Sequence, residues 1–154
     1  MRFIADHMLG KLAKYLRLAD YDVIYPPPRL DRDKRQLAID QKRILLTRST
    51  PLIRNHPGPQ YLLIASGKFR EQLQQVIRHF NLHLDPERFF RRCLICNAPV
   101  TEISKERIRD RVPPKSYAAY DQFCQCPHCQ RIYWRGSHTQ RMMDALLRLV
   151  APQS

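Results

Sequence analysis

The chain has 154 residues, of which 44% are hydrophobic, and it carries a formal net charge of +13. This hydrophobic content is normal for a globular chain with one ordinary core, so intrinsic disorder is excluded. No apolar run reaches the roughly 18 residues that a membrane span needs, and Asp6 interrupts any signal-peptide core. We therefore expect a cytoplasmic protein without a membrane segment.

Strands and helices alternate in the first half of the chain. Strands are predicted at residues 2–5, 22–25, 44–46 and 61–65, and helices at residues 8–19, from Asp31 to about residue 41, and at residues 69–80. Such alternation indicates an α/β fold with a mainly parallel sheet flanked by helices. We place this first domain at residues 1–86.

The second half, residues 87–154, has a different pattern. Prolines and cysteines replace the strand and helix rhythm until a final helical pattern at residues 138–150. Few apolar residues recur at regular spacing here, so a metal would have to supply free energy that a small core cannot. We therefore predict a zinc ribbon followed by a C-terminal helix.

Two CxxC motifs are the most specific signal of the chain. Cys93 and Cys96 form the first, and Cys126 and Cys129 form the second after an interval of 29 residues. Four thiolates complete the tetrahedral shell of structural zinc, which leaves no position for a substrate. Two redox dithiols or two disulfides are the alternative. Cys124 is then expected to be a buried or half-buried thiol outside the zinc shell.

The charge is distributed over both halves. Lys and Arg outnumber Asp and Glu by 15 to 8 up to residue 86 and by 12 to 6 afterwards. A folded surface this positive is typical of proteins that bind a polyphosphate, although a merely solvated basic surface is an alternative. Lys11, Lys14 and Arg17 follow at three-residue steps, as either a phosphate-steering ridge or the solvated face of the first helix.

Acidic residues stand where the predicted strands end. Asp6 follows the first strand, and Asp31 precedes the helix after the second, with Asp33 two residues later. Ligands of parallel sheets collect at this edge, and carboxylates are suitable ligands for Mg²⁺ or Mn²⁺. A helix N-cap is the alternative for Asp31, and a solvated first-turn acid is the role we expect for Asp33.

Several segments together resemble one family, the Mut7-C RNase domain, in which a PIN-like nuclease fold precedes a zinc ribbon. The resemblance covers nearly the whole chain, and it is carried by residues 3–13, 43–48, 93–97, 109–114, 126–129 and 132–138. It implies a metal-dependent ribonuclease with RNA as its partner. Zinc would be structural, and Mg²⁺ or Mn²⁺ would be catalytic.

The resemblance also assigns roles and shows one departure. Asp6 and Asp31 fall on the acidic positions of the family, and Thr47 and Arg48 would position the scissile phosphate. Where the family continues with a third acid, this chain has Ser49, which could at most orient a bound water. A neutral hydroxyl cannot balance a divalent cation as a carboxylate does. The alternative to a nuclease is therefore a weakened or inactive RNA-binding protein that keeps the fold.

The closing segment combines aromatic and basic side chains. Trp134, Arg135 and His138 are candidate RNA-binding residues, together with Lys11, Lys14 and Thr47, because aromatic and guanidinium planes stack on exposed bases. Packing of Trp134 between the ribbon and the first domain is the alternative. A zinc-stabilised protein adaptor is a third hypothesis, and no residue excludes DNA as the polymer.

Overall fold

The first sheet has four parallel strands, as the sequence predicts. The computed structural model describes residues 1–26, 34–54 and 60–150. The strands are β1 (Arg2–Ala5), β2 (Asp22–Ile24), β3 (Ile44–Thr47) and β4 (Tyr61–Leu63), in the order β2-β1-β3-β4. All four residues of β3 are buried, which explains its continuous apolar run.

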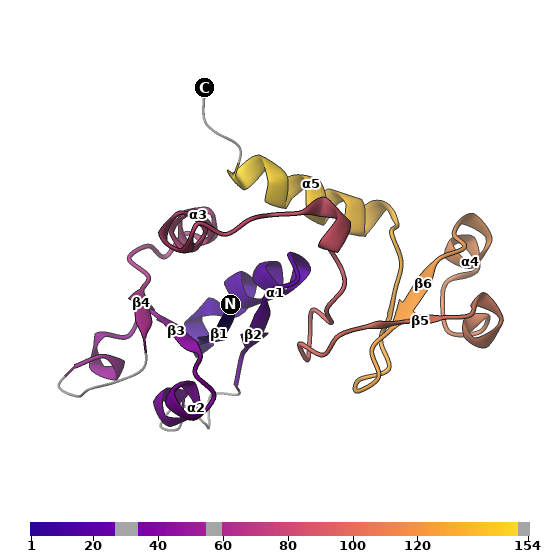
Figure 1. The fold of residues 1–154 in the computed structure, drawn as a ribbon. Helices are drawn as coiled ribbons and strands as arrows, with labels where there is room; N and C mark the ends of the chain where they lie inside the picture. Colours follow the sequence, from indigo (N-terminus) through magenta and orange to yellow (C-terminus); the bar gives the residue numbers. More distant parts are fainter. Residues whose placement is uncertain (27–33, 55–59, 151–154) are drawn as a thin grey trace.

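Helices cover both faces of this sheet (Figure 1). One face is covered by α1 (Gly10–Leu18), α3 (Phe69–Phe80) and α5 (Ser137–Val150), and the other by α2 (Lys34–Asp40). Because side chains alternate along a strand, Phe3 and Ala5 enter the larger core under α1. Ile4 and Leu45 point the other way, toward Ala38 of α2.

The ribbon, residues 91–135, has a small antiparallel sheet and short helical segments. Its strands are β5 (Thr101–Ile103), β6 (Phe123–Gln125) and β7 (Ile132–Tyr133), and α4 (Pro114–Ala119) precedes β6. Single 3-10 turns occur along the chain at His7–Leu9, Thr50–Leu52, Pro86–Arg88 and Lys105–Ile108. Ile108, Val112 and Phe123 form a core of the ribbon itself.

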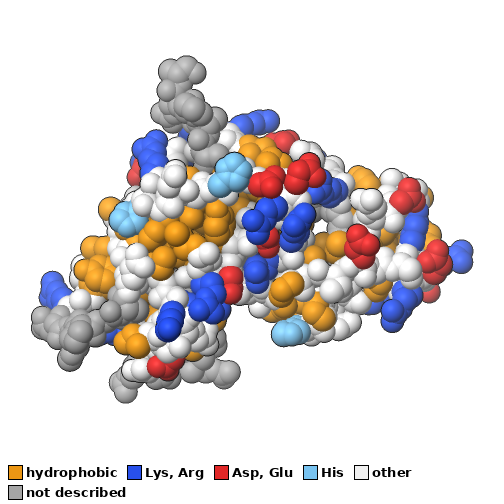
Figure 2. Space-filling view, in the orientation of Figure 1, with side chains coloured by type: hydrophobic (Ala, Val, Ile, Leu, Met, Phe, Trp, Pro, Cys, Tyr) orange, Lys and Arg blue, Asp and Glu red, His pale blue; other side chains and the backbone are white. Residues whose placement is uncertain are grey.

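The two halves of the chain share a core. Phe90, just before the ribbon, and Leu94 of the ribbon belong to the same buried cluster as the residues under α1, together with Met142 and Leu146 of α5. Figure 2 shows Lys and Arg side chains gathered near the middle of the molecule, with acidic side chains beside them. The division at residue 86 stays a prediction. No helix of the described chain is long and apolar enough to cross a membrane.

The turn formed by the first CxxC motif, residues 93–98, which we call the first knuckle, covers the open edge of β2. The backbone N–H of Val23 donates to the Asn97 side chain at 2.9 Å, and the Asn97 amide donates to Asp22 at 2.7 Å. Arg43 binds both carboxylate oxygens of Asp22, at 2.7 and 3.1 Å. Burial alone would raise the pKa of Asp22, but hydrogen bonds from Arg43 and Asn97 lower it below its ordinary value. The backbone groups of this edge strand, which would otherwise need water as a hydrogen-bond partner, are thus bound by side chains.

Arg17 is part of this junction and does not belong to a solvated ridge. Its side chain is buried, with 5% exposure, and its Nε donates to the Val23 carbonyl at 2.8 Å. Its Nη1 donates to the carbonyls of Leu94 and Ile95, at 3.0 and 2.8 Å. The interpretation of Lys11, Lys14 and Arg17 as one surface ridge is therefore wrong for Arg17, because this guanidinium binds backbone carbonyls of strand and knuckle.

Replacing Asn97 by glycine should weaken the attachment of the ribbon to the sheet. Asn97 has a φ of 71°, which glycine adopts freely, so Asn97→Gly keeps the backbone and removes only the bonds to Val23 and Asp22. We expect the free energy of unfolding to fall by about 2 kcal/mol, because the Val23 N–H loses its acceptor.

The free energy of unfolding is measured by denaturant titration, and Gln130, directly after the second CxxC motif, supplies a matched control variant. Gln130 has a φ of 62°, and its side chain bonds only within the ribbon among the described residues. Gln130→Gly should change the free energy of unfolding by no more than about 0.5 kcal/mol. Equal losses in the two variants would contradict a specific role for the Asn97 side chain.

Candidate functional site

The two CxxC segments fold into matching knuckles. In the first, the Cys93 N–H donates to the Ala98 carbonyl at 2.8 Å, and the Cys96 N–H approaches the Cys93 sulfur at 3.5 Å. In the second, the Cys126 N–H donates to the Arg131 carbonyl at 2.9 Å, and the Cys129 N–H approaches the Cys126 sulfur at 3.5 Å. Such N–H donors stabilise the negative charge of thiolates that bind a metal.

The four cysteine sulfurs form a compact set that suits a metal ion such as zinc. All four lie within 4.8 Å of one another, and two of the separations are 3.5 Å (Cys93 to Cys129) and 3.3 Å (Cys96 to Cys126). Four ligands at the usual zinc–sulfur distance in a tetrahedron lie about 3.8 Å apart. Cys93 and Cys126 are buried, and Cys124 is a half-buried thiol outside the set. The donor set therefore fits zinc.

Tyr133 supports this set from the side of the shared core. Its hydroxyl lies 3.0 Å from the Cys93 sulfur and accepts the Leu94 N–H at 3.2 Å. Burial alone would raise the pKa of the Cys93 thiol, but hydrogen bonds from the Cys96 N–H and the Tyr133 hydroxyl lower it. Burial, and then the Cys93 thiolate, raise the pKa of Tyr133, so the phenol stays protonated and donates to the sulfur. Tyr133 thus links the metal ligands to the core that both halves share.

Asp6 lies at the carboxyl ends of the two central strands. Its backbone N–H donates to the Leu46 carbonyl at 3.0 Å, which continues the hydrogen bonding between β1 and β3. Its side chain is fully buried. One carboxylate oxygen accepts the Met8 N–H at 2.9 Å, and the other accepts the Thr47 hydroxyl at 2.5 Å and the Arg48 N–H at 2.8 Å. Asp6 therefore caps the turn His7–Leu9, a local role that the sequence did not reveal. A carboxylate has about four acceptor positions, so one is left for a further ligand.

Lys34 adds a positive charge to this acid pocket, which consists of Asp6, Lys34, Thr47 and Arg48. The lysine is fully buried at the first residue of α2. Burial lowers the pKa of Lys34, and the attraction of Asp6 raises it in part. Lys34 was not among the predicted site residues, but its spacing from Leu37 and Ala38 places it on the inward face of the helix. That spacing was the available signal.

The hydroxyl of Thr47 connects Ser49 to the same pocket. The Ser49 N–H donates to this hydroxyl at 2.9 Å, and the hydroxyl donates to Asp6. The guanidinium of Arg48 lies beside Gly67, where an added Cβ would be 3.6 Å from a terminal nitrogen. The Nε of Arg48 is buried without a hydrogen-bond partner among the described residues. Thr47, Arg48 and Ser49 are thus grouped around Asp6, whereas Asp31 and Asp33 lie outside the described residues.

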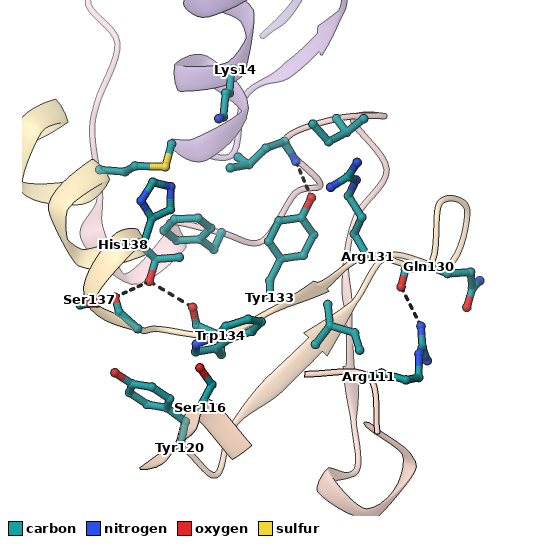
Figure 3. Close-up of a pocket in the computed structure, with 17 residues that line it drawn as sticks. Lys14, Arg111, Ser116, Tyr120, Gln130, Arg131, Tyr133, Trp134, Ser137 and His138 are labelled. Atoms are coloured by element: carbon teal, nitrogen blue, oxygen red, sulfur yellow. Dashed lines mark hydrogen bonds between the residues drawn. The ribbon is translucent and has the colours of Figure 1, made fainter. Parts of the chain in front are cut away.

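A cleft of about 670 Å³ lies between the knuckles, α4 and the start of α5 (Figure 3). We call it the ribbon cleft. Lys14, Trp134 and His138 line it together, with Tyr133, and its lining does not include Asp6. Trp134 packs on Phe123 in the core of the ribbon, with ring centroids 6.0 Å apart, and does not join the core shared with the sheet. Tyr133 makes that contact instead.

The other predicted substrate residues lie elsewhere. Arg135 lines a second cleft with Glu87, Glu102 and Asp121, on which Trp134 also borders. The ammonium of Lys11 lies over the ring of Phe69, 4.6 Å from its centroid. The predicted RNA-binding residues are therefore distributed over the acid pocket, two clefts and the surface of α1, and their roles stay predictions.

A parallel sheet with a buried carboxylate at its carboxyl edge, joined to a ribbon whose four cysteines suit a metal ion, defines the class of this α/β protein. The family model described as Mut7-C RNAse domain matches residues 1–146, and the chain belongs to that family. No curated protein and no solved structure matches the chain.

Removal of zinc should unfold the ribbon, and Trp134 will report this. It is the only tryptophan and is half-buried in the core of the ribbon. We expect a chelator to shift its emission to longer wavelength and to lower Tm by on the order of 10 °C, because structural zinc contributes several kcal/mol.

Cysteine substitutions test which thiols bind the metal. Cys129→Ser should abolish stoichiometric zinc, measured by elemental analysis, because one of four ligands is lost. Cys124→Ser should leave zinc content unchanged, because this thiol lies outside the set. Zinc loss in both variants would contradict the assigned ligand set.

Proposed function

We propose that the chain is a metal-dependent ribonuclease that hydrolyses RNA phosphodiester bonds. The position of Asp6 carries the proposal: a buried carboxylate, fixed by three hydrogen bonds, at the edge of a parallel sheet where ligands collect. The family name supports RNA as the substrate. The excess of positive charge favours a polyanion, and a reducing cytoplasm would keep the cysteines available for zinc.

Asp6 and Asp31 would hold Mg²⁺ or Mn²⁺. Such an ion lowers the pKa of a bound water and balances charge on the phosphate. Thr47 and the Arg48 N–H keep the carboxylate of Asp6 in one orientation. The buried Nε of Arg48 has no acceptor among the described residues, and this supports a role of its guanidinium in binding the scissile phosphate.

The second candidate is an RNA-binding protein that does not cleave. Two observations favour it. Ser49 supplies no charge beside Asp6, and Lys34 buries a positive charge there. The Lys34 ammonium, which Asp6 attracts, opposes the net negative charge that a divalent cation requires. This candidate predicts that RNA binds in a salt-sensitive way and is not cleaved at any metal concentration.

Asp6→Asn should abolish both RNA cleavage and Mn²⁺ binding. The amide keeps the size of the side chain, but it removes the charge that holds the cation. RNA cleavage is measured on several unpaired RNAs in the presence of Mn²⁺. Mn²⁺ binding is measured by calorimetric titration into zinc-loaded protein. Tm must be recorded as well, because Asp6 also accepts three structural hydrogen bonds.

Asp40→Asn is the control for this variant, because Asp40 is an exposed acid at the end of α2. It should cleave RNA as the unmodified chain does. Cleavage that survives Asp6→Asn in a folded, clean preparation would show that Asp6 is not the catalytic acid.

Ser49→Asp should tighten Mn²⁺ binding by on the order of tenfold and increase cleavage, because each added carboxylate raises the charge of the site. The backbone N–H of Ser49 donates to the Thr47 hydroxyl that binds Asp6, so position 49 lies at the same edge of the sheet as the acid pocket. Ser49→Asn, which has the same size without the charge, should leave Mn²⁺ affinity unchanged. Equal affinities in the two variants would argue against a cation site at this edge.

A further inference from the structure

The ribbon cleft has the chemistry of an anion site. Lys14, Arg111, Arg131 and His138 line it, and no Asp or Glu is among the described residues of its lining. The second cleft, on which Trp134 also borders, contains three carboxylates beside Arg91 and Arg135. Phe90, Tyr133 and Trp134 line both clefts and so separate a basic cleft from a mixed one, and a phosphate is favoured only in the first.

Aromatic rings add a stacking surface to these cations. Tyr120, Tyr133 and Trp134 line the cleft (Figure 3). Gly136 keeps the space beside the indole open, since an added Cβ would lie 2.8 Å from the Trp134 Nε1. Planar rings next to Lys and Arg are what an unpaired nucleotide needs, because the base stacks while the phosphates bind the cations.

The walls of the cleft are fixed before any ligand arrives. Tyr133 is held by its bonds to Cys93 and Leu94, and the Thr139 hydroxyl lies 3.0 Å from the Trp134 carbonyl and 2.8 Å from the Gly136 carbonyl. Rigid walls reduce the entropy lost on binding. The volume of about 670 Å³ lies in the usual range of small-ligand sites, roughly 300 to 1,000 Å³.

We propose that the ribbon cleft is a second RNA site, which holds one nucleotide of an unpaired strand. The base stacks on Trp134 and its neighbouring tyrosines, and Lys14 and Arg131 bind the phosphates. The choice of RNA rests on the proposed function, but the cleft does not depend on cleavage. It lies on the side of α1 and α5, whereas Thr47 and Asp6 project toward α2. The site therefore holds a strand at a distance from the atoms that would cut it.

Binding of a fluorescein-labelled ten-nucleotide unpaired RNA to the full zinc-loaded chain, without Mg²⁺ or Mn²⁺, tests the proposal. Saturating RNA should quench the emission of Trp134, because the base contacts the only indole. Lys14→Gln and Arg131→Gln should each weaken binding about three- to tenfold. Each should also reduce the slope of log affinity against log salt by about 0.7.

Arg107→Gln is the matched control. It removes one positive charge from an exposed position of the ribbon that lines neither cleft, so affinity should change less than about twofold. Equal weakening by Arg107→Gln and Lys14→Gln would overturn the proposal, because the effect would then be one of net charge. Unchanged Trp134 emission at saturation would overturn it as well, and so would equal affinity for the same sequence in a duplex.

Two further titrations distinguish the RNA site from a protein-binding cleft and from the nuclease proposal. If poly-glutamate quenches Trp134 and RNA does not, the cleft binds an acidic protein segment and the RNA site is wrong. Repeating the titration with Asp6→Asn separates the cleft from the nuclease proposal. Quenching without cleavage by the unmodified chain contradicts only the nuclease, and cleavage without quenching contradicts only the cleft.

Discussion

The closure of the β2 edge by the first knuckle is the interaction on which the rest of the structure depends. An edge strand presents backbone groups that must find partners, and here Asn97 and Arg17 supply them to Val23. The same guanidinium binds two carbonyls between Cys93 and Cys96, so the loop that carries two metal ligands is also part of the sheet edge. A metal held by the four cysteines would therefore be coupled to the order of β2 through a few buried polar contacts, which are strong only while every partner is present.

The acid pocket has a structural function that is independent of chemistry. The carboxylate of Asp6 accepts the Met8 N–H of a 3-10 turn and the Arg48 N–H after β3, and it attracts the buried ammonium of Lys34 in α2. A chain can therefore retain this carboxylate for folding after a second or third acid has been replaced. The presence of Asp6 alone does not distinguish a working nuclease from a binding protein, and the Ser49→Asp variant is designed to separate the two.

The sequence predicts the elements well because their signals are local. Apolar spacing defines β3 and α3, and two CxxC motifs define the knuckles without any tertiary information. What it could not predict are contacts between distant residues. Arg17 looked like a surface residue because its helix spacing matched that of Lys14, and only the position of residues 94 and 95 buries it. Arg135 and His138 are close in sequence but line different clefts, because the chain leaves β7 after Tyr133 and turns into α5 at Ser137.

The junction at β2 also determines how the protein can be divided. A fragment that ends at residue 86 would contain all four strands of the parallel sheet, but it would lack Asn97 and the carbonyls that bind Arg17. Its β2 would present an open N–H to solvent and a buried guanidinium without acceptors. Such an edge pairs readily with another chain, so the fragment should self-associate more strongly than the whole protein. The ribbon thus covers the strand edge at which the sheets of two chains could pair.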